Sequence, residues 1–270
     1  SKIIRSSSVC FFVENCTSCY KIMYGHPKIY RLIGDDVSKM VDAALDAIRL
    51  NPANVENWSH AGLVYSNVAS FTRGADAFAL KNYQEAIHRD PQSPLYTMAI
   101  GKLMLARADQ ARTLLDAKDL AIARQAKQDE TEALEQARTW LRNAVALKAD
   151  YVPAMYYLAV VLDREGKTAE AISFLERVAT QDQSVDRIFE LGMLYDRVGN
   201  RAKAIEAFER VVAMDATQMR AHFQLASLYE AAGRLREAVA QLHLVAASMP
   251  ANTAVQKRLQ VLEVKARGAK

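Results

Sequence analysis

Three stretches of the chain share one pattern and decide its fold: LAVVLDREGKTAEAISFLERV at 158–178, LGMLYDRVGNRAKAIEAFERV at 191–211 and LASLYEAAGRLREAVAQLHLV at 225–245. In each, the first Leu is followed by Ala or Gly, a glycine stands eight residues after that Leu, and an alanine follows five residues after the glycine. The apolar residues of both halves recur at helical spacing. Because glycine adopts the positive φ that ends a helix, each stretch predicts two antiparallel helices joined at its glycine.

Small residues mark where the two helices of a pair meet. One is the Ala or Gly in the second position of each stretch, and the other is the alanine after the turn. A single pair cannot bury its own apolar face, whereas stacked pairs can. We therefore predict an all-α fold, a right-handed α-solenoid of antiparallel helix pairs with a concave inner wall.

The composition is that of an ordinary globular protein. Of the 270 residues, 51% are hydrophobic and 24% are charged, and the net charge is +4. Residues 1–34 hold five cations and one anion, so the rest of the chain is balanced and nucleic acid is not an expected partner. No apolar run approaches the roughly 20 residues that span a bilayer. We expect a soluble protein, with the cytoplasm favoured, or the soluble part of a membrane-attached protein.

The small residue, tyrosine, glycine, alanine and closing proline of this pattern resemble the tetratricopeptide repeat (TPR), in its bacterial type. The resemblance extends upstream through Trp58, Gly62, Tyr65, Ala79 and Pro91. It implies a leader at 1–34 and a solenoid at 35–270. The solenoid divides into a partial repeat at 35–52, a repeat with an extended turn at 55–93, a repeat with a long inserted hairpin at 94–150, regular repeats at 152–184, 185–218 and 219–252, and a capping helix at 253–266.

The inserted hairpin adds about 24 residues between Met104 and Ala137. We expect both of its helices to be lengthened, with a polar tip at 125–131 and a projection of roughly 18 Å. One interpretation is a self-packed antiparallel coiled coil. The other is a docking arm, with self-association through the 105–138 hairpin.

Three cysteines and a histidine lie close together near the start of the chain, at Cys10, Cys16, Cys19 and His26. The spacing of Cys16 and Cys19 would let two thiolates chelate zinc. A second regular pair is missing, so we favour a passive leader and expect no metal.

The sequence carries no recognisable catalytic motif. HExxH and GxSxG are absent, and the five histidines are scattered over different repeats. Gly166, Lys167 and Thr168 end no phosphate-binding loop, because the glycine required five residues earlier is Val161. We expect neither catalytic residues nor a cofactor.

The resemblance implies a binding surface on the concave wall, lined by the first helix of each pair. Three positions recur there, three residues before the small residue, one after it and four after it. They form an aromatic row, a central row and an acidic row: Tyr156, Phe189 and Phe223; Val160, Met193 and Ser227; Asp163, Asp196 and Glu230. Such a groove suits a peptide or a partner helix with apolar anchors and Lys or Arg.

A second interpretation of the same rows stays open. The aromatic residues would fill gaps between helices, and the acidic residues would solvate the surface. Arg164 and Arg197 stand next to two of the acids, and pairing with them would lower the field of the groove.

The function that follows is a non-catalytic protein–protein interaction module, a scaffold that binds a protein or peptide ligand. The alternative is a structural or assembly tail domain of a larger bacterial membrane or envelope complex, because the extended turn resembles that in the soluble tails of some bacterial membrane proteins. A third interpretation is an accessory domain of an enzyme.

Overall fold

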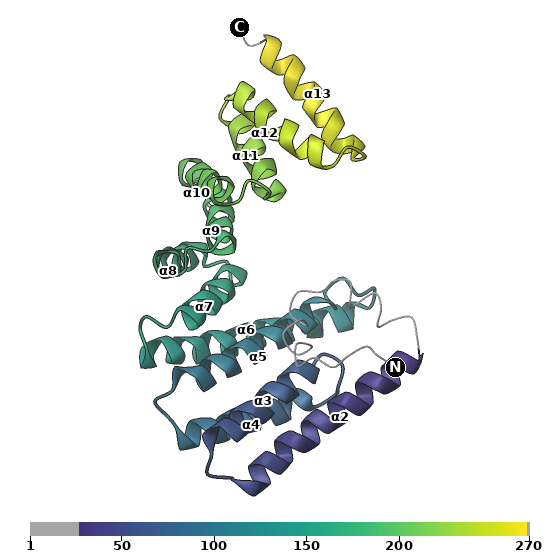
Figure 1. Cartoon of the computed structure of the whole chain (residues 1–270), viewed down its shortest axis with the longest axis vertical. Helices are drawn as coiled ribbons and strands as arrows, with labels where there is room; N and C mark the ends of the chain where they lie inside the picture. The colour runs from purple at the N-terminus through teal and green to yellow at the C-terminus, as the bar shows by residue number, and fades with distance from the viewer. Residues whose placement is uncertain (1–26, 269–270) are drawn as a thin grey trace. The chain divides into compact units, whose positions relative to one another are not determined.

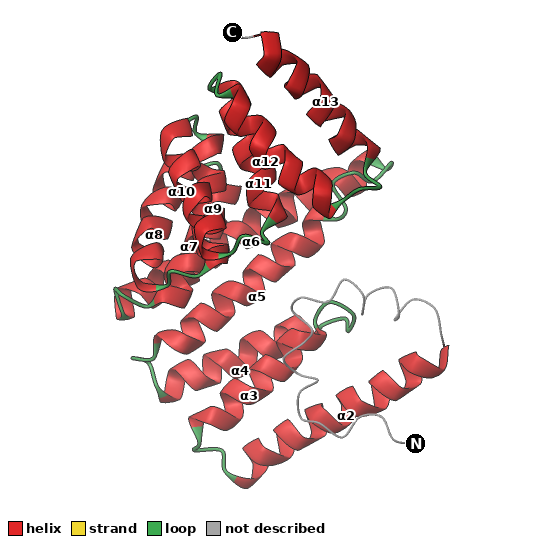
Figure 2. Ribbon diagram, turned by 45° about the horizontal axis from the view of Figure 1, so that its top comes forward, coloured by secondary structure: helices red, strands yellow, loops and turns green. Residues whose placement is uncertain are grey.

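The computed structural model describes residues 27–268, which form twelve helices and no strand (Figures 1 and 2). This confirms the predicted fold class, an all-α solenoid of antiparallel helix pairs with one elongated hairpin. The chain divides into two compact units, one ending at Pro91 and one beginning at Gln92. The zinc ligands considered above lie outside the described residues.

The first unit holds α2 (Pro27–Leu50), α3 (Val55–Val68) and α4 (Ala75–Arg89). Helix α2 thus begins inside the stretch predicted to be a leader. The antiparallel helices α3 and α4 approach closely at Gly62, where a Cβ atom would lie 2.7 Å from the ring of Tyr83. The extended turn between them ends at Gly74, which has a φ of 81°. Trp58 lies under the guanidinium of Arg89, 4.3 Å from the ring centroid.

The second unit begins with the long hairpin and continues with three shorter pairs and a final helix (Figure 1). Neighbouring helices along the chain pack against each other. The helices are α5 (Pro94–Arg112), α6 (Leu120–Leu147), α7 (Val152–Arg164), α8 (Thr168–Gln181), α9 (Val185–Arg197), α10 (Arg201–Met214), α11 (Met219–Ala231), α12 (Leu235–Ser248) and α13 (Thr253–Gly268).

The turns within the three shorter pairs follow one geometry. Gly166, Gly199 and Gly233 have φ values of 78°, 77° and 74°. The amide after each glycine donates to the carbonyl five residues earlier, as from Lys167 to Leu162 at 2.8 Å. The glycine amide donates to the carbonyl three residues back, so the last carbonyl groups of the helix are satisfied.

A second set of contacts ties successive pairs together. The hydroxyl of Tyr195 on α9 donates to Glu176 on α8, and the hydroxyl of Tyr229 on α11 donates to Glu209 on α10. Both tyrosines are buried. The junctions between α8 and α9 and between α10 and α11 are therefore each closed by a hydrogen bond from a buried tyrosine to a carboxylate.

The hairpin differs from the prediction in the position of its tip, which lies at 113–119 and not at 125–131. The reason is the cap of α6, since the carboxylate of Asp119 accepts hydrogen bonds from the amides of Ala121 and Ile122. The stretch predicted to be the tip lies within α6, where Ala126 and Glu130 are buried. Helix α5 ends earlier than expected, and α6 accounts for most of the extra length.

The two helices of the hairpin approach closely at Gly101. A Cβ atom there would lie 2.5 Å from Cγ of Leu141, which is completely buried. Glycine is the residue that leaves room for this leucine.

Candidate functional site

The nine predicted site residues lie on α7, α9 and α11, the first helices of three successive pairs. The face of these helices that carries them is termed the row face. Each helix contributes one aromatic, one central and one acidic position. The structure brings the rows into contact across helix boundaries, through basic side chains that are not among the nine predicted site residues.

Each residue of the aromatic row has an arginine of the following first helix over its ring. Arg187 lies 3.5 Å from the ring centroid of Tyr156. The equivalent distances are 4.6 Å from Arg220 to Phe189 and 4.8 Å from Arg258 to Phe223. Such contacts between cations and aromatic rings contribute about 0.5–1 kcal/mol each at exposed sites.

The three aromatic residues differ in burial. Phe189 is buried and makes an edge-on contact with Phe208 of α10, at 5.3 Å between ring centroids. It belongs to the core. Phe223 is 37% exposed, and Tyr156 is half-buried. Phe223 is therefore the most accessible aromatic residue of the row.

Tyr156 takes part in a polar cluster with α9. Its hydroxyl donates to Oε1 of Glu190 at 2.9 Å, and Arg187 lies 3.4 Å from Oε2 of the same carboxylate. Burial, reinforced by the charge of Glu190, raises the pKa of Tyr156 to about 12. Burial also raises the pKa of Glu190 above its ordinary value. The cluster fixes the tyrosine in its neutral form.

A pH dependence of stability follows from this cluster. The unfolded chain loses the Tyr156 proton near pH 10, whereas the folded chain keeps it to about pH 12, so the free energy of unfolding should fall as pH rises through this interval. Tyr156→Phe should lessen the fall between pH 9 and pH 11.5 by about 1 kcal/mol, since solvent screens the half-buried ring. Urea unfolding at pH 9 and at pH 11.5 measures the free energy of unfolding of both proteins. Equal falls in wild type and variant would show that Tyr156 does not cause the pH dependence.

The central row is only partly covered. Val160, Met193 and Ser227 are all half-buried. The hydroxyl of Ser227 donates to the carbonyl of Phe223 at 3.0 Å and accepts from Arg258 at 3.0 Å. Val160 and Met193 thus contribute the open apolar surface of the row face.

The acidic row is partly neutralised, at Asp163 and Glu230, by basic side chains of other helices. Arg197 donates to both carboxylate oxygens of Asp163. Glu230 pairs with Lys265 at 2.9 Å and with Arg258 at 3.3 Å, and the hydrogen bond from Lys265 lowers the pKa of Glu230. The cations that pair with these acids lie on α9 and α13, each the next row-bearing or final helix that packs beyond the acid's own pair.

Sequence reasoning missed the arginines that cover the aromatic row and the partner of Arg164, which is Asp109 on α5. A signal was present, because Arg187 and Arg220 are 33 residues apart, and so are Arg164 and Arg197. Recurrence at the repeat period marks a position that contacts the neighbouring repeat.

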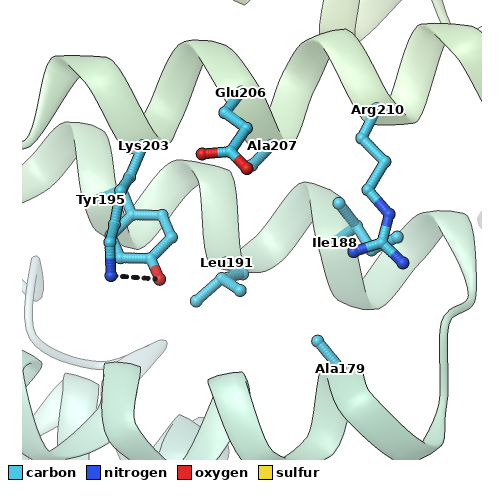
Figure 3. Close-up of a pocket in the computed structure, with 8 residues that line it drawn as sticks. All are labelled: Ala179, Ile188, Leu191, Tyr195, Lys203, Glu206, Ala207 and Arg210. Carbon is cyan, nitrogen blue, oxygen red and sulfur yellow. Dashed lines mark hydrogen bonds between the residues drawn. The ribbon is translucent and has the colours of Figure 1, made fainter.

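A separate pocket of about 230 Å³ lies between α8, α9 and α10 (Figure 3). Its apolar floor includes Ile188 and Leu191, and Lys203 and Arg210 stand at its rim. Lys203 lies 2.9 Å from Glu176, and Arg210 donates to Gln183 at 2.8 Å.

Residues 27–268 contain no cluster of three or more His, Cys, Asp or Glu side chains placed to hold a metal ion. Among the helices that the structure describes, none has the length and apolar character needed to cross a membrane.

Similar structures include that of the TPR protein YrrB, with a TM-score of 0.60 and 16% identity over 82% of this chain and 99% of that chain. The pilF protein of Pseudomonas aeruginosa has a TM-score of 0.58 and 13% identity over 85% and 91%, respectively. For TTC0263, a TPR protein of Thermus thermophilus, the TM-score is 0.51 and the identity 18% over 74% and 93%. These likenesses show a shared fold.

Sequence comparison gives a narrower result. Curated protein sequences include no match to the chain. Two family models match, both described as tetratricopeptide repeat, one at residues 153–183 and one at 198–261. These matches, together with the stacked helix pairs and the TPR proteins of the same fold, identify the chain as a member of the tetratricopeptide repeat superfamily.

Proposed function

We propose that the row face of α7, α9 and α11 binds a polypeptide partner, either as an extended peptide or as a helix. Membership of the TPR superfamily supports a protein–protein interaction module, and members of this superfamily are generally non-catalytic scaffolds. YrrB, which has the same fold, is described as having an unusual peptide-binding site. The proposal assigns the contact surface in this chain to the three rows.

The observation that carries the proposal is the way α11 holds Arg258 of α13. The guanidinium lies over the ring of Phe223, at 4.8 Å, and bonds to Ser227 at 3.0 Å and Glu230 at 3.3 Å. One residue of each row therefore contributes to holding one basic side chain of a helix. The row positions have the chemistry to hold a helix of suitable sequence.

The apolar contribution is expected from Val160 and Met193, because both are partly exposed. Phe189 is a poor choice of anchor, since it is buried against Phe208. Substitution of Phe189 would lower the stability of the fold as well as the affinity for a peptide. Substitution of Met193 should affect mainly the affinity, because its side chain is only half-buried.

Selection of peptides from a phage-displayed random dodecapeptide library on the immobilised full chain tests the proposal. Met193→Ala should weaken binding of a selected synthetic peptide about fivefold or more, a loss of roughly 1 kcal/mol typical of an interface anchor. Met214→Ala is the matched control, because Met214 is 48% exposed on α10 and lies outside the row face. Fluorescence anisotropy gives both affinities. Failure to select any peptide, or equal losses in the two variants, would contradict the proposed function.

Self-association through the 105–138 hairpin is a second proposal, favoured by apolar side chains near the tip. Leu114, Leu120 and Ile122 are 51%, 72% and 47% exposed. Apolar side chains gathered on a surface mark sites of association. Analytical ultracentrifugation decides this point, since a monomer at high protein concentration would contradict it.

A further inference from the structure

Ion pairs join the first helices of successive pairs in the second unit, and their cations recur at one position. Arg164 of α7 pairs with Asp109 of α5, and Arg197 of α9 pairs with Asp163 of α7. Lys265 of α13 pairs with Glu230 of α11. These three pairs are termed the ladder.

The ladder lacks one member, at the step from α9 to α11. Its cations lie at positions 164, 197 and 265, and the repeat period places the missing one at residue 231, 34 residues after Arg197 and 34 before Lys265. Residue 231 is Ala231, which is exposed and ends α11. Alanine cannot supply a charge to the acid on the preceding helix.

The acid left open by this gap is Asp196. Within residues 27–268, its carboxylate has neither an ion pair nor a hydrogen bond, whereas Asp163 and Glu230 both have cationic partners. Asp196 is partly exposed, so a group from outside can reach it. It is the acid of the row face that is available to a partner.

We propose that Asp196 receives a Lys or Arg side chain of the bound polypeptide, which takes the place that Arg197 or Lys265 takes on the other helices. The inference rests on the proposed function, because the basic residue belongs to the peptide on the row face. Met193 lies three residues before Asp196 on α9, hence on the same side of the helix. The aliphatic stem of the ligand side chain would lie along Met193 while its charged end bonds to the carboxylate.

A basic side chain fits this position better than a metal ion. Hard cations such as Ca²⁺ take six to eight oxygen ligands, and the neighbouring row and ladder positions hold Met193, Ser227 and Ala231. A single carboxylate beside Met193 and Ala231 matches one ammonium or guanidinium group. The chain's own Lys265 and Arg258, held by Glu230, show both kinds of partner at the equivalent acid.

Four variants and two peptides test the inference. The peptides are a selected dodecapeptide and the same sequence with its basic residues replaced by norleucine. Ala231→Lys places a lysine within reach of Asp196, and Asp196→Asn removes the charge. Each should weaken binding of the basic peptide at least tenfold. The norleucine peptide should bind the wild type weakly, and neither variant should weaken it further.

The controls match each variant in chemistry. Ala232→Lys adds the same charge at the adjacent exposed residue, and Glu206→Gln removes an acid that is exposed on α10, outside the row face. Both should change affinity less than threefold. Circular dichroism should show that all four variants keep the helical content of the wild type.

The outcomes separate the inference from the function on which it rests. If the wild type selects no peptide, the proposed function fails and the inference fails with it. If a peptide binds and Met193→Ala weakens it, while Asp196→Asn and Ala231→Lys do not, the inference alone is overturned. Equal losses in Ala231→Lys and Ala232→Lys would also overturn it, because they would indicate a general effect of charge.

Discussion

Phe208→Ala should lower the free energy of unfolding of the second unit by about 3–5 kcal/mol, the usual cost of removing a buried phenylalanine ring. Phe208 is completely buried. Its ring contacts Phe189 edge-on at 5.3 Å, and a Cβ atom at Gly192 would lie 2.9 Å from it. The ring thus fills the space between α9 and α10, and alanine would leave a cavity there. Urea unfolding followed by circular dichroism measures the loss.

Phe71→Ala is the control for this prediction. Phe71 lies in the extended turn of the first unit and is 58% exposed, so the same chemical change should cost less than about 1 kcal/mol. Because each repeat contacts mainly its neighbours, the Phe208 variant should lose hydrogen-exchange protection first in α9 and α10. Similar losses of stability in both variants would show that Phe208 does not hold the two helices together.

Gly101→Ala should destabilise the long hairpin by about 1–3 kcal/mol, the range typical of overpacking. The new Cβ atom would lie 2.5 Å from Cγ and 2.8 Å from Cδ2 of Leu141, which is completely buried. This expected loss runs against helix propensity, which favours alanine over glycine by about 1 kcal/mol. A net loss would therefore show that the contact outweighs the propensity. Thermal and urea unfolding give the sign directly.

A double-mutant cycle supplies the control. Leu141→Ala alone should cost about 2–5 kcal/mol. In the double variant, Leu141→Ala removes the side chain that Gly101→Ala would meet, so the combined loss should be smaller than the sum of the two by at least about 1 kcal/mol. Additive losses would mean that the two residues do not contact each other.

The helix pairs were predictable from the sequence because their turns carry glycine at a fixed interval. Gly166, Gly199 and Gly233 each adopt the positive φ expected of them. The hairpin tip was misplaced because its sequence contains neither Gly nor Pro. Its turn is set by the side chain of Asp119 and by the packing of α5 on α6. A single capping aspartate does not stand out in a stretch that is rich in charged residues, so the sequence does not mark the start of α6.

The candidate site was predictable in part, for a related reason. Repeat spacing placed the rows on α7, α9 and α11, but it could not show how far each residue is buried. Phe189 is buried because Phe208, from another helix, lies against it. The pairing of Asp163 and the open state of Asp196 depend on which residue stands at the ladder position of the next first helix, Arg197 or Ala231. The position of a residue within its repeat can be predicted from that repeat alone. Its ion-pair partner can be predicted only when the sequence of the next repeat is considered as well.

The tyrosine–glutamate contacts between helix pairs constrain how the length of such a chain can change during evolution. In both contacts a tyrosine of one regular repeat donates to a glutamate of the repeat before it, Tyr195 to Glu176 and Tyr229 to Glu209. Gain or loss of a whole repeat recreates the same junction. Loss of half a repeat would leave a buried hydroxyl without its acceptor, at a cost of about 1–3 kcal/mol. Related chains that still fold should thus differ in length by whole repeats, or by insertions between the two helices of one pair. The long hairpin carries its own extra residues at such a position.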